Sequence, residues 1–304
     1  MAARVAERES QVVLGLDPDP RSLWPAAVAA PRAPAATPAQ AAAAAVLAHC
    51  RALIDATAHA CVAVKPQLAR FEALGAPGWA ALEALAEHAR GHGLLVIADG
   101  KRGDIDVTAG AYASALLGGM DTPFGRVDGL RADLATVNPL MGADALAPFV
   151  EAARAVNAGV LVLVRTSNPG AVDVEDLRLE RGGAVWERIA EIVQELGAPG
   201  VGEGGLSDVG AVLGATRPEH LERARTLMPH AVFLLPGVGA QGGRVEELAA
   251  AFSPGRAAGL VSASRSVAEA HRREGGDAAR AACAEAERLR ERAWRLADVV
   301  LGTA

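Results

Sequence analysis

The segment ADGKRGDI carries charged side chains of both signs at a spacing that suits proton transfer. Asp99 and Lys101 follow an apolar run and point the same way in an extended segment, and Asp104 falls at the start of the next predicted helix. Lys65 ends an earlier apolar run, and we expect it beside them. A lysine between two carboxylates keeps both ionised and stays protonated, so the four groups offer an ammonium acid next to a fixed negative charge. The same spacing also fits a surface salt-bridge network.

A second candidate site is the glycine-rich segment LPGVGAQGGRVEEL, which follows another apolar run and opens a predicted helix. Backbone N–H groups in such a loop can hold a phosphate, with help from the helix N-terminus. Arg265, in the later segment VSASRSV, can pair with phosphate oxygens. The two segments together match the phosphate site that barrels build after their seventh and eighth strands. A tight glycine turn without a ligand is the alternative interpretation.

Further polar residues follow other apolar runs. Asp17 in GLDPDP can accept hydrogen bonds from ribose hydroxyls, and Ser167 with Asn168 in RTSNPG can bind a polar ring. Each can instead cap the segment that follows, since Asp and Ser favour N-caps and turns. Both interpretations stay open on these residues alone.

The elements that would position these residues are eight short apolar runs that alternate with longer segments of helical spacing. The runs are QVVLGLD, CVAVKP, GLLVIAD, DLATVNP, GVLVLVRTSN, VGAVLGAT, AVFLLPG and AAGLVSAS. Eight such units over about 250 residues predict a (β/α)8 TIM barrel, an α/β fold. A doubly wound open sheet is the competitor. The barrel is favoured because nearly every run ends in polar or glycine-rich residues, where barrel active sites are built.

We expect a single barrel domain over residues 1–304, with a surface insertion around 119–132 and a C-terminal helix over 275–300. In the run PAAVAAPRAPAATPAQ, the first part is predicted to be a loop. Thr37 followed by Pro38 predicts an N-cap and the start of an alanine-rich helix.

The amino-acid composition limits the kinds of partner that the protein can bind and the compartment in which it acts. The net charge of −6, the single Tyr and the five Phe argue against binding to a nucleic-acid polymer. Three scattered cysteines suit a reducing compartment. The N-terminus lacks the apolar core of a signal peptide, and no apolar run approaches about 18 residues, so we expect a cytoplasmic protein without a membrane partner.

The sequence offers little support for a metal-binding or a dinucleotide-binding motif. His88 and His92 are four residues apart, but no Glu follows the first His as it does in HExxH. They are interpreted as favourable charges at a helix C-terminus, and no metal site is predicted. The sequence has no GxGxxG after its first run and no GxxxxGK[ST].

The chain resembles the orotidine 5′-phosphate decarboxylase family, in its longer bacterial type (type 2), over nearly its whole length. The resemblance rests on motifs in the family's order, namely KPQLARFEALG, ADGKRGDI, TVNPLMGADAL, VLVRTSNPG, GAVLGAT, LLPGVGAQGG and SASRS. Ala69 and Arg70 depart from the family, in place of an apolar pair after Lys65.

The resemblance implies that orotidine 5′-monophosphate is converted to UMP and CO₂ without cofactor or metal. The implied catalytic residues are a tetrad of Lys65, Asp99, Lys101 and Asp104, with Lys101 as proton donor. The implied substrate-binding residues are Asp17, Ile105, Thr108, Asn138, Ser167, Pro236, Gly237, Gln241, Gly242 and Arg265.

The resemblance implies that Asp17 binds ribose hydroxyls and that Ser167 contacts the pyrimidine edge. Gln241 and Arg265 hold the 5′-phosphate under the loop from Gly237. Members of the family form homodimers with shared active sites, so the resemblance implies that residues 104, 105 and 108 reach into the partner's site.

Two alternatives are kept. A metal-dependent sugar-phosphate decarboxylase or synthase of the same superfamily places an acidic metal ligand at the end of the second strand, where Lys65 would repel Mg²⁺. A non-catalytic nucleotide-phosphate sensor would not need all four charges.

Overall fold

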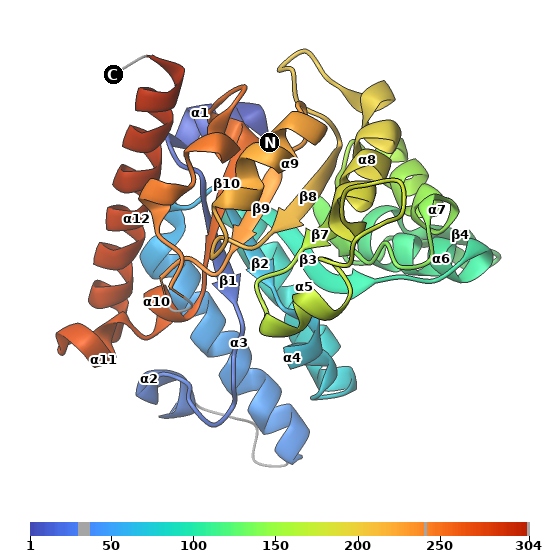
Figure 1. Ribbon diagram of the computed structural model, residues 1–304. Helices are drawn as coiled ribbons and strands as arrows, with labels where there is room; N and C mark the ends of the chain where they lie inside the picture. The colour runs from blue at the N-terminus through green and yellow to red at the C-terminus, as the bar shows by residue number, and fades with distance from the viewer. Residues whose placement is uncertain (30–36, 240–241, 303–304) are drawn as a thin grey trace.

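The computed structural model describes residues 1–29, 37–239 and 242–302, and a closed barrel of parallel strands forms its centre (Figure 1). The strands run in the order β1-β10-β9-β8-β7-β6-β3-β2 around the barrel. Their bounds are β1 Val12–Leu16, β2 Ala63–Pro66, β3 Leu95–Arg102, β6 Leu134–Val137, β7 Gly159–Arg165, β8 Val209–Leu213, β9 Phe233–Pro236 and β10 Gly259–Ala263. Seven of them lie within the predicted runs, and β3 begins in its run, GLLVIAD, but continues past Asp99 to Arg102. The TIM barrel prediction is confirmed, and the open sheet is excluded because β1 pairs with β10 as well as with β2.

Helices surround the barrel and return the chain from one end of the strands to the other (Figure 1). The longer ones are α3 Pro38–Thr57, α5 Ala76–Gly91, α6 Asp106–Ala113, α7 Ala143–Ala155, α8 Val185–Gly197, α9 Glu219–Leu227 and α12 Ala278–Leu301. The shorter ones are α1 Ala2–Arg8, α2 Pro25–Ala29, α4 Leu68–Glu72, α10 Arg265–Ala268 and α11 Ala270–Glu274. Single turns of 3-10 or π helix are η1 Ala58–Ala60, η2 Ser114–Gly118, η3 Pro169–Asp173, η4 Ala198–Gly200, η5 Val245–Glu247, η6 Ala249–Phe252 and η7 Arg256–Ala258.

The start of α3 shows how local chemistry sets an element. The Gln40 N–H donates to the Thr37 hydroxyl at 3.3 Å, and the Thr37 N–H donates to Gln40 Oε1 at 2.8 Å. Pro38 occupies the first helical position, where its missing N–H costs nothing. The predicted N-cap is therefore confirmed. The predicted loop before it is wrong at Pro25–Ala29, which form the short helix α2, and residues 30–36 of that run lie outside the described residues.

The core has two layers. Side chains such as Val13, Ile97 and Leu161 fill the barrel interior, while the opposite faces of the strands pack against the helices. Strands buried on both faces account for the continuous apolar runs in the sequence. By length and composition Pro38–Ala60 resembles a membrane span, but half of it is buried within the protein, which is typical of a core helix.

Two peripheral features correspond to the predicted insertion and the predicted last helix. Within 119–132, strands β4 (Met120–Thr122) and β5 (Gly125–Val127) form a hairpin that belongs to a separate sheet from the barrel. The Phe124 side chain at its tip is fully exposed. Helix α12 runs along the outside of the barrel (Figure 1) and covers Ala278–Leu301, close to the expected 275–300.

Candidate active site

A cavity of about 620 Å³ opens where the barrel strands end. Its lining comes from strand ends and the loops that follow them: Asp17, Lys65, Gln67, Arg70, Asp99, Lys101, Thr136, Leu163, Thr166, Ser167, Asn168, Val212, Leu234, Pro236, Gly237, Val238, Ser262, Ser264 and Arg265. The carboxyl ends of the strands are the face on which barrels place their active sites. The volume is in the range of small-molecule sites, which run from about 300 to 1,000 Å³.

Three of the four predicted tetrad residues meet in this cavity. Lys65 Nζ donates to Asp99 Oδ2, and Lys101 Nζ donates to Asp99 Oδ1 at 2.5 Å. Lys65 and Asp99 are buried, whereas the Lys101 side chain keeps 43% of its surface exposed to the cavity. The carboxylate therefore holds two ammonium groups, one fixed in the wall and one that faces any bound molecule.

Lys101 reaches this position through an irregularity in β3. The pairing of β3 with β6 shifts register between Ala98 and Arg102, and Lys101 has a left-handed φ of 48°. A β-bulge of this kind redirects a side chain at the rim of a barrel. The Lys101 N–H donates to the Thr136 hydroxyl at 2.9 Å, and that hydroxyl donates to Asp99 Oδ1 at 3.0 Å. Thr136 thus links the lysine backbone to the carboxylate.

The charges of this group reinforce one another. Burial disfavours the charge on Asp99, but the ammonium groups of Lys65 and Lys101 outweigh it and lower the pKa of Asp99 to about 2. Burial likewise works against the charge on Lys65, yet the carboxylates of Asp99 and Asp17 raise its pKa above the ordinary value. Asp99 therefore stays a carboxylate and Lys65 an ammonium at neutral pH.

Asp104 does not join this group within one chain. It lies in the loop before α6, where its Oδ1 accepts the Ile105 N–H at 2.8 Å, and it is absent from the cavity lining. The prediction that Asp104 begins a helix is wrong by two residues, because α6 starts at Asp106. Ile105 and Thr108 are exposed on the same segment and also lie outside the lining.

Asn138 also lies outside the cavity lining. Its Oδ1 accepts the Leu140 N–H at 3.0 Å in the turn after β6. Arg102, the residue after Lys101, lies outside the cavity lining and pairs with Glu72. Its guanidinium lies 5.5 Å from the centre of the Tyr112 ring.

The predicted phosphate residues lie on the other side of the cavity from β3. Pro236 and Gly237 at the end of β9 line it together with Arg265 at the start of α10. Gly237 and Gly242 have left-handed φ values of 102° and 93°, which other residues adopt only with strain. Gly242 lies outside the lining, and Gln241 lies outside the described residues.

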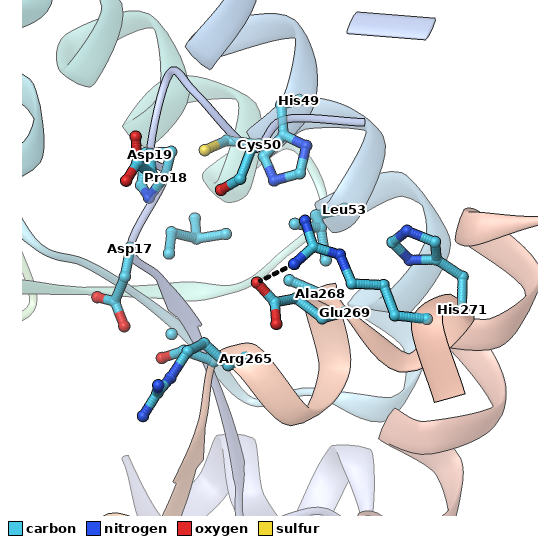
Figure 2. A pocket seen from close by; sticks show the side chains of 15 residues that line it. Asp17, Pro18, Asp19, His49, Cys50, Leu53, Arg265, Ala268, Glu269 and His271 are labelled. Atoms are coloured by element: carbon cyan, nitrogen blue, oxygen red, sulfur yellow. Dashed lines mark ion pairs between the residues drawn. The ribbon is translucent and has the colours of Figure 1, made fainter. Parts of the chain in front are cut away.

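Asp17 and Ser167 complete the predicted set. Asp17, just beyond β1, lines the main cavity and a smaller neighbouring pocket of about 50 Å³. Figure 2 shows Asp17 and Arg265 on one side of this pocket and His49 and Cys50, from α3, on the other. Ser167 lines the main cavity. Its backbone packs against Gly214 so closely that a Cβ on residue 214 would lie 2.9 Å from the Ser167 Cα.

Sequence reasoning missed several lining residues, chiefly Thr136, Gln67, Leu163 and Thr166. Gln67 Nε2 donates to Asp99 Oδ2 at 3.3 Å. Thr136 could have been found as a hydroxyl between apolar residues of the run DLATVNP, because a buried polar group needs a hydrogen-bond partner. Arg70, known from the sequence only as a departure from the family, adds a cation to the cavity.

The cavity has the chemistry of anion and proton handling rather than of metal binding. Among the described residues the carboxylates in its lining are Asp17 and Asp99, and Asp99 is already neutralised by two ammonium groups. A divalent cation at Asp99 would lie against Lys65 and Lys101, which repel it. The residues at the end of β2 and β3 therefore do not fit the metal-dependent alternative.

Comparison with known proteins agrees with this arrangement. The family described as "Orotidine 5'-phosphate decarboxylase / HUMPS family" matches residues 10–281. This chain belongs to that family. An orotidine 5′-phosphate decarboxylase of Deinococcus radiodurans is 47% identical over 238 residues, which cover 78% of this chain and 82% of the relative. One of Haloarcula marismortui is 38% identical over 303 residues and 96% of each chain.

Solved structures carry the same relationship. The Leishmania donovani OMP decarboxylase is 32% identical to this chain, with a TM-score of 0.67 over 95% of this chain and 98% of the other. The barrel and the named relatives therefore agree on one family and one fold.

Proposed function

We propose that the chain decarboxylates orotidine 5′-monophosphate to UMP and CO₂, the last step of UMP synthesis, at the cavity around Lys101. The single observation that carries this is the array in which Asp99 binds both Lys65 and Lys101 at the mouth of the barrel. The curated relatives named as orotidine 5′-phosphate decarboxylases support the same activity.

The array suits the chemical difficulty of the reaction. Cleavage of the bond between C6 and the carboxylate leaves its electron pair at C6, where no π system delocalises it. The Lys101 ammonium, exposed to the cavity and anchored by Asp99, stabilises that charge more than it stabilises the ground state. It then donates a proton to C6, and CO₂ departs. No cofactor is needed, because the electron pair is quenched by this proton.

The remaining residues position the substrate. Arg265 pairs with the 5′-phosphate beside the loop that starts at Gly237, Asp17 accepts hydrogen bonds from the ribose, and Ser167 contacts the pyrimidine edge. Contacts far from C6 hold the reacting carbon against Lys101, so remote binding energy assists the chemical step. In this proposal Gln241 also binds the 5′-phosphate.

The active unit is a homodimer in this proposal. Asp104, Ile105 and Thr108 reach into the partner's cavity, where Asp104 completes the tetrad. In support, apolar side chains on and near α6 are exposed, with Ile105 at 55%, Val107 at 80% and Leu140 at 79%. Exposed apolar groups gathered beside a functional residue are typical of an interface between subunits.

Residues 1–304 form one domain, in which the β4–β5 hairpin is a surface insertion. The protein acts in the cytoplasm, which the three free cysteines favour, because thiols persist in a reducing compartment.

The test is loss of the orotate absorbance with purified protein, with and without EDTA, beside a Lys101→Ala variant. We expect turnover that EDTA leaves unchanged and that falls by at least about 100-fold in the variant, as for loss of a main electrostatic group. Failure to turn over orotidine 5′-monophosphate, or turnover abolished by EDTA, would refute the function. Full activity in Lys101→Ala would refute the role of Lys101 alone.

A further inference from the structure

A group of metal-ligating side chains lies on the outside of the barrel, remote from the cavity. His88, near the end of α5, and His92, which follows that helix, are joined by Asp55 from the last turn of α3. Among the described residues these three form a group whose ligand atoms lie within 4.8 Å of one another. The sequence showed the two histidines but not the carboxylate, since Asp55 is more than thirty residues away.

The three side chains converge on one point. The Nε2 atoms of His88 and His92 lie 2.7 and 3.0 Å from the same oxygen, Asp55 Oδ1. The two imidazole rings have their centres 4.9 Å apart and are tilted by 58°. In a tetrahedral zinc site with bonds near 2.0 Å, ligand atoms lie about 3.3 Å apart, so an ion fits after a small outward movement of the carboxylate.

The side chain of Arg8 holds the backbone beside these ligands in place. Arg8 on α1 donates from Nη1 to the Ala58 carbonyl at 2.6 Å, three residues after Asp55, and from Nη2 to the His92 carbonyl. One guanidinium therefore ties the end of α3 to the end of α5. Ligands on fixed helix ends lose little conformational entropy on binding an ion.

We propose that Asp55, His88 and His92 form a binding site for a divalent transition metal of the Zn²⁺ class. Two imidazole nitrogens and one carboxylate oxygen are the donor set that such ions prefer, whereas Mg²⁺ and Ca²⁺ prefer oxygen ligands. Each histidine binds through Nε2 as the neutral tautomer with its proton on Nδ1. The side chains keep 25%, 36% and 55% exposure for His88, His92 and Asp55, so water completes the coordination.

The site is separate from the catalytic cavity. His92 lies three residues before β3 begins, at the opposite end of the strand from Lys101. A metal ion there should tie α3 to α5 without touching the reacting groups. We therefore expect it to act on stability and not on turnover of orotidine 5′-monophosphate.

The test is titration of tag-free, EDTA-treated protein with Zn²⁺ by calorimetry, with the Tm measured at each metal concentration. We expect one saturable ion per chain and a rise in Tm. His88→Ala and the nearly isosteric Asp55→Asn should each weaken binding by at least about tenfold, the lower bound for even an outer-shell change. Substitution of Co²⁺ should give visible absorption bands that the His88→Ala variant lacks.

His59→Ala is the matched control, because His59 is a half-exposed histidine paired with a carboxylate, Glu287, at the same distance of 2.7 Å. It lacks a second imidazole and should bind Zn²⁺ as the parent chain does. Three results would overturn the proposal: no saturable binding, unchanged binding in a His88→Ala, His92→Ala double variant, or loss of binding in His59→Ala. Circular dichroism of each variant shows that the barrel is intact.

Discussion

Replacement of Thr136 by Val tests whether one buried hydroxyl holds the catalytic array together. Thr136 is 1% exposed, and its hydroxyl accepts the Lys101 N–H and donates to Asp99. Valine has nearly the same shape but can do neither. The charged Asp99 carboxylate then loses the hydrogen bond that the hydroxyl donated, and the Lys101 N–H loses its acceptor.

The magnitude follows from these two contacts. A hydrogen bond to a charged group contributes about 1.5 to 3 kcal/mol, and a buried donor left unpaired costs about 1 to 3 kcal/mol. We expect Thr136→Val to lower the free energy of unfolding by about 3 to 5 kcal/mol in urea. The left-handed φ of Lys101 is then held by fewer contacts, so its ammonium moves. A displacement near 1 Å lowers kcat/KM by about 100-fold.

Thr136→Ser is the matched control, because it keeps the hydroxyl and removes only a methyl group. It should cost about 1 kcal/mol of unfolding free energy and leave kcat/KM within a few-fold of the parent. Urea unfolding and the orotate absorbance assay measure the two quantities. If the Val and Ser variants behave alike in both, the hydroxyl does not link Lys101 to Asp99 and the reasoning fails.

Three further predictions concern other parts of the molecule. The pKa of Asp99 is about 2 when folded against 3.8 when unfolded, so its stabilisation is complete above about pH 4 and is lost as the pH falls toward 2; the lowering corresponds to roughly 2 kcal/mol. Urea unfolding at pH 7 and pH 2.5 should show this loss in the parent chain but not in Asp99→Asn, and equal losses in both would contradict it. Val107→Asp should shift the protein from dimer to monomer in light scattering and lower kcat, because Asp104 would no longer reach a partner. Val299→Asp, at a residue 68% exposed on α12, should change neither, and a fully active Val107→Asp dimer would refute the interface. Trp24→Phe removes the bond from Nε1 to the Ala268 carbonyl, 2.9 Å long, which fastens the chain after β1 to α10; we expect KM to rise several-fold with kcat unchanged, and an unchanged KM would show that this bond does not position Arg265.

The sequence predicted the barrel well because its signals are local. Each strand is buried on both faces, so it appears as an unbroken apolar run such as GVLVLVR, and the end of each run marks the mouth of the barrel. The N-cap at Thr37 is equally local, since its partner Gln40 is three residues away.

The approach of Lys65 to Asp99 was foreseen because parallel strands that are neighbours in the barrel end at the same face. The route of Lys101 was not. Period-two spacing places Asp99 and Lys101 on one face of a regular strand, whereas the two meet through a bulge with Lys101 in a left-handed conformation. Spacing also set Asp104 beside them, and the turn before α6 places it elsewhere in a single chain.

The order of the elements, the residue types at the strand ends and the family resemblance could all be predicted from the residues in chain order. These follow from periodicity and from motifs read along the chain. The side-chain contacts became visible only in the folded chain, such as Thr136 between Lys101 and Asp99, or Asp55 between His88 and His92. Those contacts join residues more than thirty positions apart, and packing of the helices and the register of the strands bring them together. Neither the helix packing nor the strand register leaves a local signal in the sequence.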